Sequence, residues 1–405
     1  MFDVAQIRED FPILSTEVHG RGLVYLDSGA TAQKPRCVIE REAELYRTTN
    51  ANVHRGVHTL SERMTEEYEA ARERVRVFIG ASSREEVIFT AGATASINTV
   101  AYAWSERFLS AGDNILISEI EHHSNIVPWQ LAAERKGAEI RVLPVDDEGR
   151  LRTELLGELL DSRTRLVAVT QASNTLGTRP DLRSIIDAAH AVGAVVVVDG
   201  CQGVVHGGVD VAALGCDFYA FSGHKLYAPT GIGVLYGRRE LLEQMPPFMG
   251  GGDMVDKVTF AKTTYAPLPL KFEAGTANYI GAVALGEAIR YLEALPAAEV
   301  EAHEQQLLRY ATDRLTEIEG LRIYGTTADK SPIISFNVEG CDHYDIGMIL
   351  DKMGVAVRTG HHCAEPTMTR FGVNGVVRAS IGLYNNQEDI DALVNGVRRA
   401  VAMLR

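Results

Sequence analysis

The stretch Ala194-Val-Val-Val-Val-Asp199 is the most apolar strand-like run in this chain of 405 residues. Its four consecutive valines show no alternation of polar and apolar side chains, which is typical of a strand that helices cover on both faces. Such strands lie in the middle of doubly wound α/β sheets. The run therefore predicts an α/β fold with residues 194–199 near the centre of a mainly parallel sheet.

Similar short runs rich in β-branched residues alternate with helical patterns between residues 86 and 236, which is the rhythm of βαβ units. The expected strands are residues 87–90, 114–118, 140–143, 166–170, 195–199, 218–222 and 231–236. A Gly- and Pro-rich segment follows from residue 246, and it shows no strand pattern. We expect the seven strands to form the sheet of a large domain.

The pattern changes in the last third of the chain. Strand-like residues 321–324, 333–338, 355–358 and 377–383 surround a helical segment at 345–353, and an amphipathic helix is expected at 388–404. This arrangement is typical of a small α+β domain. We predict a large domain at residues 81–280 and a small domain formed by residues 1–80 and 281–405, with the N-terminal segment completing the small domain or wrapping a dimer.

The chain is acidic, with 54 Asp and Glu residues against 40 Lys and Arg residues and a formal net charge of -14. This charge repels nucleic acids and anionic membranes, so we expect neither as a partner. The first ten residues carry charges and no apolar stretch reaches about 18 residues, which favours a cytoplasmic protein. The cysteines are too scattered for a disulfide framework and favour a reducing compartment; they are Cys37, Cys201, Cys216, Cys341 and Cys363.

Lys225 and Asp199 are the first two candidates for chemistry. Lys225 ends the stretch Ser222-Gly-His-Lys225 among apolar segments, and a lysine in such a place suits Schiff-base chemistry. Asp199 closes the valine strand, where a carboxylate can hold the proton of a pyridinium nitrogen. Taken singly, a solvated loop lysine and a helix-capping aspartate would explain the same residues.

Other polar residues follow the expected strands and would share one pocket, because ligands of open α/β sheets bind beyond the carboxyl ends of the strands. Gly92-Ala-Thr94 precedes a helix whose free amides can hold a phosphate, although ordinary capping explains most such sequences. Ser222 and His224 could add donors. His122 and His123 offer rings for stacking and proton transfer, and Asn174 could bond a ring hydroxyl.

Together these residues resemble the fold-type I pyridoxal-phosphate enzymes, and specifically the class V aminotransferase branch that contains the cysteine desulfurases. The segment Arg358-Thr-Gly-His-His-Cys-Ala-Glu-Pro366 is similar to the cysteine loop of the group II, SufS-type or selenocysteine lyase-like, desulfurases. The resemblance implies an aspartate-aminotransferase-like large domain with a mixed, mainly parallel seven-stranded sheet. Four further segments fit the group: Leu26-Asp-Ser-Gly-Ala-Thr-Ala-Gln-Lys-Pro35, Asn52-Val-His-Arg-Gly-Val-His58, Glu121-His-His-Ser-Asn125 and Phe272-Glu-Ala-Gly-Thr276.

The resemblance also implies roles for individual residues, with pyridoxal 5'-phosphate as the cofactor. Lys225 would be the Schiff-base lysine, Asp199 the pyridinium partner and His122 the stacking and acid-base residue. Further cofactor contacts would come from Asn174, Gln202, Thr94, Ser222, His224 and, from a partner subunit, Thr276. Cys363 would be the sulfur-accepting nucleophile, and the substrate would be bound by Arg378, Arg358, His54 and Arg55.

The implied activity is conversion of L-cysteine to L-alanine, with a persulfide left on Cys363 of a homodimer. A SufE- or SufU-like acceptor would then carry the sulfur to iron-sulfur cluster assembly in the SUF system. Selenocysteine lyase activity on L-selenocysteine is one alternative. A nucleotide-binding or regulatory α/β protein is another, disfavoured because no GxGxxG follows the first strand of the sheet.

Two features depart from the group. The chain has Ala95-Ser96 where a glutamate is expected after the phosphate-loop threonine, so a contact across the dimer would be missing or replaced. Glu365 follows the nucleophile closely, and its negative charge should raise the pKa of the Cys363 thiol unless neighbouring cations offset it. We expect no metal, because the adjacent residues His361, His362 and Cys363 could not share one tetrahedral ion without strain.

Overall fold

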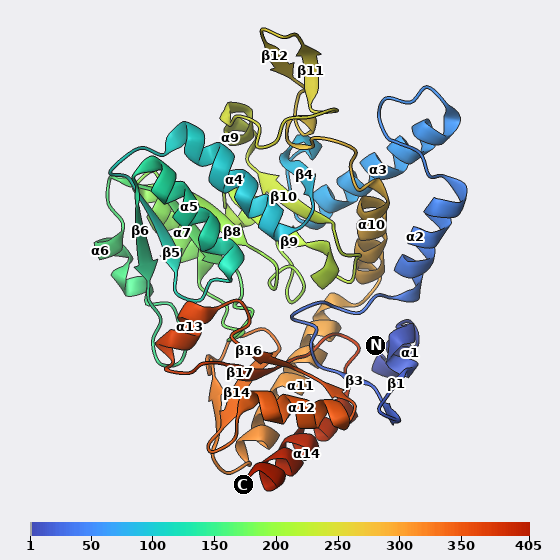
Figure 1. Cartoon of the computed structure of the whole chain (residues 1–405), viewed down its shortest axis with the longest axis vertical. Helices are drawn as coiled ribbons and strands as arrows, with labels where there is room; N and C mark the ends of the chain where they lie inside the picture. Colours follow the sequence, from blue (N-terminus) through green and yellow to red (C-terminus); the bar gives the residue numbers. More distant parts are fainter. Residues whose placement is uncertain (1) are drawn as a thin grey trace.

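The structure is a computed structural model that describes residues 2–405, and its main feature is a large twisted sheet above a smaller one (Figure 1). Within the described residues β10 runs antiparallel to its neighbours, and the other strands of the large sheet are mutually parallel. In spatial order this seven-stranded sheet contains β4 (Val87–Thr90), β10 (Gly233–Gly237), β9 (Phe218–Ser222), β8 (Val195–Asp199), β7 (Thr164–Thr170), β5 (Asn114–Ser118) and β6 (Glu139–Leu143). The predicted mixed, mainly parallel seven-stranded sheet is confirmed.

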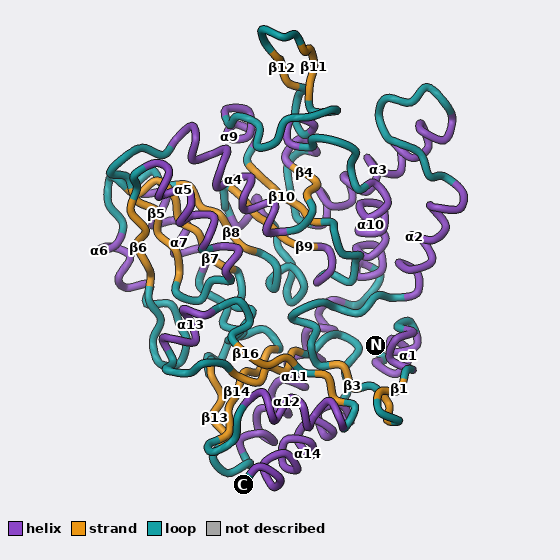
Figure 2. The backbone as a smooth tube through the Cα atoms, viewed as in Figure 1, coloured by secondary structure: helices purple, strands orange, loops and turns teal. Residues whose placement is uncertain are grey.

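Strand β8 lies at the centre of the sheet because its valines face two separate cores. Val196 and Val198 pack into the core on one face, whereas Val197 packs into the core on the other. The first core includes side chains of α3 (Thr59–Phe78), α7 (Leu182–Ala191) and α10 (Tyr279–Glu293), and the second includes those of α4 (Ala93–Phe108) and α5 (Val127–Lys136). The layers of helix, sheet and helix are visible in Figure 2.

The smaller sheet is antiparallel and has its own core, as expected for an α+β domain. In spatial order it contains β13 (Leu321–Tyr324), β14 (Ile333–Val338), β17 (Val376–Ser380) and β16 (Arg358–Gly360). Three helices pack on it, namely α11 (Ala297–Thr316), α12 (His343–Lys352) and α14 (Gln387–Leu404). Strand β15 (Val355–Ala356) pairs in parallel with β3 (Val24–Tyr25), so part of the N-terminal segment joins this domain.

The packing of three helices differs from what the predicted domain division implies. Helices α2 (Arg36–Thr48) and α3 share one hydrophobic core with α10 and the large sheet. The sequence-based division at residues 80 and 281 placed all three helices in the small domain. The packing favours grouping them with the large sheet, and the domain boundaries themselves stay a prediction.

A β-hairpin of β11 (Val255–Val258) and β12 (Thr263–Tyr265) projects from the top of the large domain (Figure 1). The sequence predicted no strand between residue 246 and the small domain, and this was wrong for the hairpin. Its strands are polar and mostly exposed, so no buried face imposes the alternation that marks other strands. Phe260, in the turn between the two strands, is fully exposed.

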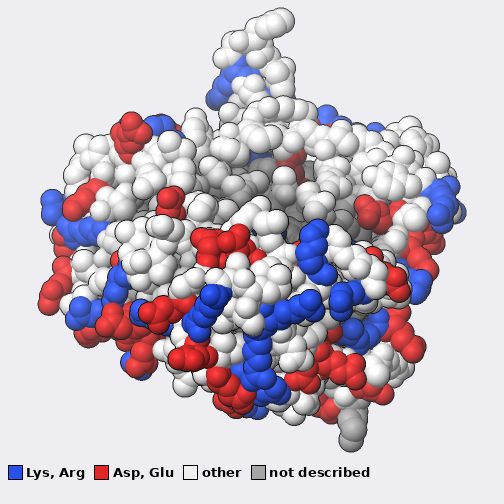
Figure 3. Space-filling view, turned by 60° about the horizontal axis from the view of Figure 1, so that its bottom comes forward, with Lys and Arg blue, Asp and Glu red and all other residues white. Residues whose placement is uncertain are grey.

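The remaining elements are short connections. The helices are α1 (Val4–Glu9), α6 (Leu156–Leu159), α8 (Val211–Leu214), α9 (Arg239–Gln244) and α13 (Glu365–Arg370), and β1 (Glu17–Val18) pairs with β2 (Arg21–Gly22). The 3-10 turns are η1 (Pro12–Ser15), η2 (Arg84–Glu86), η3 (His123–Asn125), η4 (Thr153–Leu155), η5 (Gly223–Lys225) and η6 (Leu270–Phe272). Across residues 2–405 no helix combines the length and apolarity needed to cross a bilayer. Figure 3 shows acidic and basic side chains on one face, with several basic side chains gathered below the centre of the view.

Candidate active site

A pocket of about 360 Å³ lies where the carboxyl ends of the parallel strands of the large sheet meet the small domain. Most of the residues that the sequence singled out line it, and they come from both domains. They are Thr94, His122, Asn174, Asp199, Ser222, His224, Lys225, Arg358, Cys363 and Arg378. The structure therefore brings the predicted lysine, carboxylate and thiol to one site.

Asp199 and Lys225 stand at the ends of neighbouring strands. Asp199 is the last residue of β8, is 4% exposed, and accepts a hydrogen bond of 3.0 Å at Oδ1 from the backbone N–H of Cys201. Lys225 lies in the η5 turn directly after β9, which is parallel to β8. The carboxyl group of Asp199 and the amine of Lys225 thus face one cavity, as pyridinium and Schiff-base chemistry require.

A cradle for an anion lies at the amino end of α4. Gly92 has a φ of +147°, a conformation that side chains rarely adopt, and it starts the helix without a side-chain cap. The hydroxyl of Ser222 accepts from the backbone N–H of Ala93 over 2.8 Å, while the Oγ atoms of Thr94 and Ser124 lie 2.7 Å apart. The other first-turn amides have no partner within the helix, so the residues present fit a phosphate group.

His122 is neutral near pH 7. Burial, together with the positive charge of Lys225, lowers the pKa of His122 to about 4. Its Nδ1 accepts a hydrogen bond of 3.1 Å from the backbone N–H of Ser124, so the proton of the neutral ring is on Nε2. Burial and Lys225 lower the pKa of His224 to about 4 in the same way. Both rings are therefore uncharged donors or acceptors beside the lysine.

Two arginines approach the pocket from the small domain. Arg378 is 2% exposed and donates from Nη1 to the carbonyl oxygen of Asn174 over 2.9 Å. Its Nε is buried and has no hydrogen-bond partner within the described chain. Arg378 and Arg358 both bond Asp27, to which the sequence gave no role although it lies in the quoted segment from Leu26 to Pro35. An unpaired guanidinium donor in a pocket suits a carboxylate ligand.

Cys363 lies in a strained loop at the mouth of the pocket. His362 and Cys363 both have positive φ values, +53° and +55°, which are unfavourable for residues other than glycine. The loop is held by two hydrogen bonds from the large domain: His123 N–H to the carbonyl oxygen of Cys363 over 2.7 Å, and Asn174 Nδ2 to that of His362 over 2.9 Å. A fixed but exposed sulfur can meet both a ligand in the pocket and a partner outside it.

The five cysteines differ in exposure. Cys363 is exposed, Cys201 and Cys216 are buried, and Cys37 and Cys341 are partly buried. Burial and the charge of Asp199 raise the pKa of the Cys201 thiol to about 12, so this neighbour within the pocket stays protonated. Among the five, Cys363 is the one suited to nucleophilic chemistry.

Some functional candidates escaped the sequence-based reasoning. Glu121 is fully buried, and burial raises its pKa to about 8. It accepts hydrogen bonds of 2.7 Å from Asn125 Nδ2 and from the backbone N–H of Thr170, joining the ends of two strands. His362 also lines the pocket, and burial together with Arg378 lowers its pKa to about 3. The sequence signal that could have indicated Glu121 is its position directly before His122.

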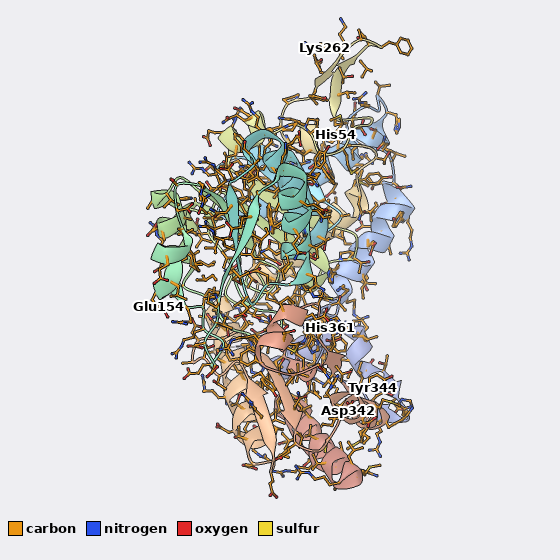
Figure 4. The ribbon with its side chains drawn as sticks, turned by 60° about the vertical axis from the view of Figure 1, so that its left-hand side comes forward. His54, Glu154, Lys262, Asp342, Tyr344 and His361 are labelled. Atoms are coloured by element: carbon orange, nitrogen blue, oxygen red, sulfur yellow. The ribbon has the colours of Figure 1, made fainter. Side chains whose placement is uncertain are left out.

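Four predicted site residues lie outside this pocket in the single chain. Gln202 is buried and donates from Nε2 to the carbonyl oxygen of Gly29 over 2.8 Å. Thr276 is exposed. His54 contacts Glu69 over 3.1 Å, and Arg55 contacts Asp253 over 3.0 Å. Figure 4 shows His54 close to the base of the hairpin and well away from His361 of the cysteine loop.

No group of three or more metal-ligating side chains is close enough to hold an ion in residues 2–405. The rings of His123 and His361 instead stack, with their centroids 5.8 Å apart. His123 Nε2 accepts from the backbone N–H of Glu365 over 3.2 Å. His123 therefore supports the cysteine loop from the large domain.

Comparison with known proteins identifies the class to which this fold and site belong. Residues 24–393 match the family model described as aminotransferase class-V, so the chain belongs to that family. This membership confirms the expected pyridoxal-phosphate-dependent enzyme, and the residues of the pocket fit that cofactor. The alternative of a nucleotide-binding or regulatory protein is abandoned.

Within the family the chain belongs with the cysteine desulfurases. It is 50% identical over 404 residues to the cysteine desulfurase of Pectobacterium carotovorum, covering 100% of this chain and 99% of the relative. It is 51% identical to that of Dickeya dadantii, covering 100% and 98%. The crystal structure of the cysteine desulfurase CsdA from Escherichia coli is 42% identical, with a TM-score of 0.93 over 100% of both chains. The cysteine desulfurase of Thermococcus onnurineus is 38% identical, with a TM-score of 0.93 over 99% and 98%.

Proposed function

We propose that this protein converts L-cysteine to L-alanine and retains the sulfur as a persulfide on Cys363. The observation that carries the proposal is the position of Cys363: it is the exposed thiol of the chain and lines the same pocket as Lys225 and Asp199. The curated relatives named cysteine desulfurase support it over their whole length.

The pocket would hold pyridoxal phosphate at its phosphate group and at its ring nitrogen. The amino end of α4 with Thr94 and Ser222 would bind the phosphate, and Asp199 would hold the proton of the ring nitrogen. His122 would lie against the ring, and Asn174 would approach its hydroxyl. When bound, the cofactor supplies an aldehyde that condenses with amines and a protonated ring that withdraws electrons from the substrate.

The protein's own residues would position the substrate and move its protons. Arg378 would bind the α-carboxylate through guanidinium N–H groups that Asn174 and Asp27 leave unpaired. His122 is uncharged near pH 7 because of its lowered pKa, and it would present the proton on Nε2 to the substrate. Arg358 lines the mouth beside Cys363.

Sulfur transfer would occur at the Cys363 thiolate. It attacks the sulfur of bound cysteine, a sulfur-sulfur bond forms, and the carbon-sulfur bond breaks. The electron pair of the broken bond stays with the substrate β-carbon, which takes up a proton and becomes the methyl group of alanine. The strained loop would place the thiol for this attack without further ordering.

A second copy of the chain would complete the site. Thr276, His54 and Arg55 lie outside the pocket of their own subunit. His54 lies near the hairpin in Figure 4, and Arg55 contacts Asp253, two residues before the first hairpin strand. Val57 is 97% exposed and Phe260 is fully exposed in this region. Large exposed apolar side chains near predicted site residues support a homodimer that supplies the three residues in trans.

The persulfide would pass to a small acceptor protein of the SufE or SufU kind and serve iron-sulfur cluster assembly in the cytoplasm. An exposed persulfide is accessible to such an acceptor, and five cysteines without a disulfide fit a reducing compartment.

The function is tested by measuring alanine released from L-cysteine, and sulfur passed to a purified SufE-like or SufU-like acceptor, for the wild type and Cys363→Ala. The variant should lose transfer from cysteine at least about a hundredfold, since it lacks the nucleophile. Transfer at the wild-type rate would refute the persulfide. L-Selenocysteine is the second substrate: a variant that still cleaves it would show that the pocket acts on selenocysteine without Cys363.

A further inference from the structure

One carbonyl oxygen beside Lys225 accepts hydrogen bonds from three donors. It belongs to His224, the residue directly before the pocket lysine. The backbone nitrogen of Ala32 lies 3.1 Å from this oxygen, the hydroxyl of Thr31 lies 3.2 Å from it, and the Nζ of Lys34 lies 3.0 Å from it. Of these donors the ammonium is the charged one, and charge-assisted hydrogen bonds are stronger than neutral ones.

The ammonium of Lys34 bonds carbonyl and hydroxyl oxygens instead of a carboxylate. Besides the carbonyl of His224, it reaches the carbonyl oxygen of Ala32 and, over 3.4 Å, the hydroxyl of Thr31. Lys34 forms no ion pair within residues 2–405, and burial lowers its pKa to about 8, so most of it is still charged at pH 7. A partly buried cation without a carboxylate needs such hydrogen bonds, and all three of its N–H groups are used.

The carbonyl of His224 is held from outside its own turn. In the η5 turn the N–H groups of Leu226 and Ala228 both donate to the carbonyl oxygen of Gly223. In the described chain, every hydrogen bond to the His224 carbonyl comes from residues 31–34. The orientation of this peptide group, and of the lysine that follows it, therefore depends on the N-terminal segment.

These hydrogen bonds join two walls of the pocket. Residues 29–31 line it from the segment that follows β3, and His224 and Lys225 line it from the η5 turn. Lys34 does not line the pocket, so its side chain can influence the chemistry only through the turn.

We propose that Lys34 is a positioning residue for Lys225. Its ammonium holds the carbonyl of His224 and thereby fixes the turn that presents the Lys225 amine to the cofactor aldehyde. The turn stays in place when the substrate amine displaces the lysine, so that Lys225 can return after each turnover. The inference rests on the proposed function, because it takes Lys225 as the lysine that bonds the cofactor.

The test is a double-mutant cycle of Lys34→Met and Lys225→Ala, measured as the equilibrium affinity of the whole chain for pyridoxal phosphate. Methionine keeps the apolar stem of lysine and loses the ammonium. With Lys225 present, Lys34→Met should weaken the affinity about tenfold, because the amine is less well placed. In the Lys225→Ala background, where no lysine bonds the cofactor, the same change should alter the affinity by less than about twofold. A residue that merely supports the pocket would weaken both backgrounds equally.

The kinetics of alanine release from L-cysteine give a second measurement. In Lys34→Met kcat should fall about tenfold while KM stays within about twofold, because Arg378 and the rest of the substrate contacts are untouched. Lys34→Arg keeps a cation with several N–H donors and should recover kcat to about a third of the wild-type value. Because this variant keeps the charge, it also separates the role of the ammonium from any loss of folding in Lys34→Met.

Lys271→Met is the matched control. Lys271 also donates to backbone carbonyl oxygens, those of Leu242 and Glu243, over 3.0 and 3.1 Å. Burial lowers its pKa as well, and it lies outside the pocket. Its loss removes the same kind of contact at another place, so kcat and the affinity for the cofactor should stay at the wild-type values.

The outcomes separate the two proposals. If Lys225→Ala loses affinity and Lys34→Met matches the wild type, or weakens both backgrounds equally, the role of Lys34 is wrong and the proposed function stands. A Lys34→Arg variant as slow as Lys34→Met would also refute the role of the ammonium. If Lys225→Ala binds the cofactor as tightly as the wild type, with an unchanged visible spectrum, Lys225 does not bond the cofactor and both assignments are refuted.

Discussion

The backbone N–H of His123 donates a hydrogen bond of 2.7 Å to the carbonyl oxygen of Cys363. His123 starts the η3 turn of the large domain, beside His122, whereas Cys363 belongs to the loop after β16 of the small domain. The bond therefore joins the two domains at the nucleophile. Since the loop is strained at His362 and Cys363, its conformation depends on this contact and its neighbours.

Thr367 provides a test of that dependence. It is fully buried at the start of α13, and its hydroxyl donates to the carbonyl oxygen of Glu119 over 2.9 Å, a further link between the small domain near the cysteine loop and the large domain. Thr367→Val keeps the shape and loses this bond, which costs about 1 kcal/mol of loop docking. We expect persulfide formation to slow about fivefold while the visible spectrum of the cofactor is unchanged. An unaltered rate would show that the loop is held without this link.

His362 should make the stability of the protein depend on pH. Its pKa is about 3 in the folded protein, because of burial and then Arg378, and near 6.5 in an unfolded chain. Below about pH 6.5 the unfolded chain takes up a proton that the folded protein does not, so stability falls as the pH drops toward 3. Urea unfolding should show a loss from pH 7 to pH 5 that is about 1–2 kcal/mol smaller in His362→Gln. Equal losses in both proteins would contradict the assignment.

Val197 should be a main contributor to the stability of the large sheet. It is 0% exposed and faces the core under α4 and α5. Val197→Ala should lower the free energy of unfolding by about 2 kcal/mol, because it leaves a cavity in a packed core. Val77→Ala, at a side chain that is 55% exposed, should change it by less than about 0.5 kcal/mol. Similar effects of the two changes, measured by chemical denaturation, would refute the central position of β8.

The proposed dimer predicts that two inactive variants complement each other. Lys225→Ala lacks the pocket lysine, and Arg55→Ala lacks a residue that we assign to the neighbouring subunit's site. After mixed refolding or co-expression, a heterodimer would contain one site with both residues intact. Alanine release should recover to about a quarter of the wild-type value, the share that random pairing gives for half of the dimers with one working site. Failure to recover above either variant, with dimers present by light scattering, would place Arg55 in its own subunit's site.

Much of the fold could be predicted because burial leaves a pattern in the sequence. Val195 to Asp199 lack polar alternation since both faces of β8 are covered, and the structure places this strand at the centre. The residues at strand ends, such as Asp199, Asn174 and Lys225, could be grouped because parallel strands end at the same edge. In the structure these three residues line one pocket.

Other features could not be predicted, for identifiable reasons. The hairpin β11–β12 has no buried face, so its sequence shows no alternation. Asp27 is one carboxylate in a short connection, and its arginine partners are 331 and 351 residues away along the chain. The packing of α10 with α3 is likewise a long-range contact. Thr276 and Arg55 could be proposed only from the resemblance, because they lie outside the pocket of the single chain.

The central claim is that Cys363 carries the sulfur removed from cysteine, and mass analysis of the protein tests it most directly. After brief incubation of the cofactor-loaded enzyme with L-cysteine, without acceptor or reductant, the peptide that contains Cys363 should gain the mass of one sulfur atom. The peptides that contain Cys37, Cys201, Cys216 and Cys341 should not gain it. Alanine release at the normal rate with no added sulfur on Cys363, or with the sulfur on another cysteine, would contradict the account.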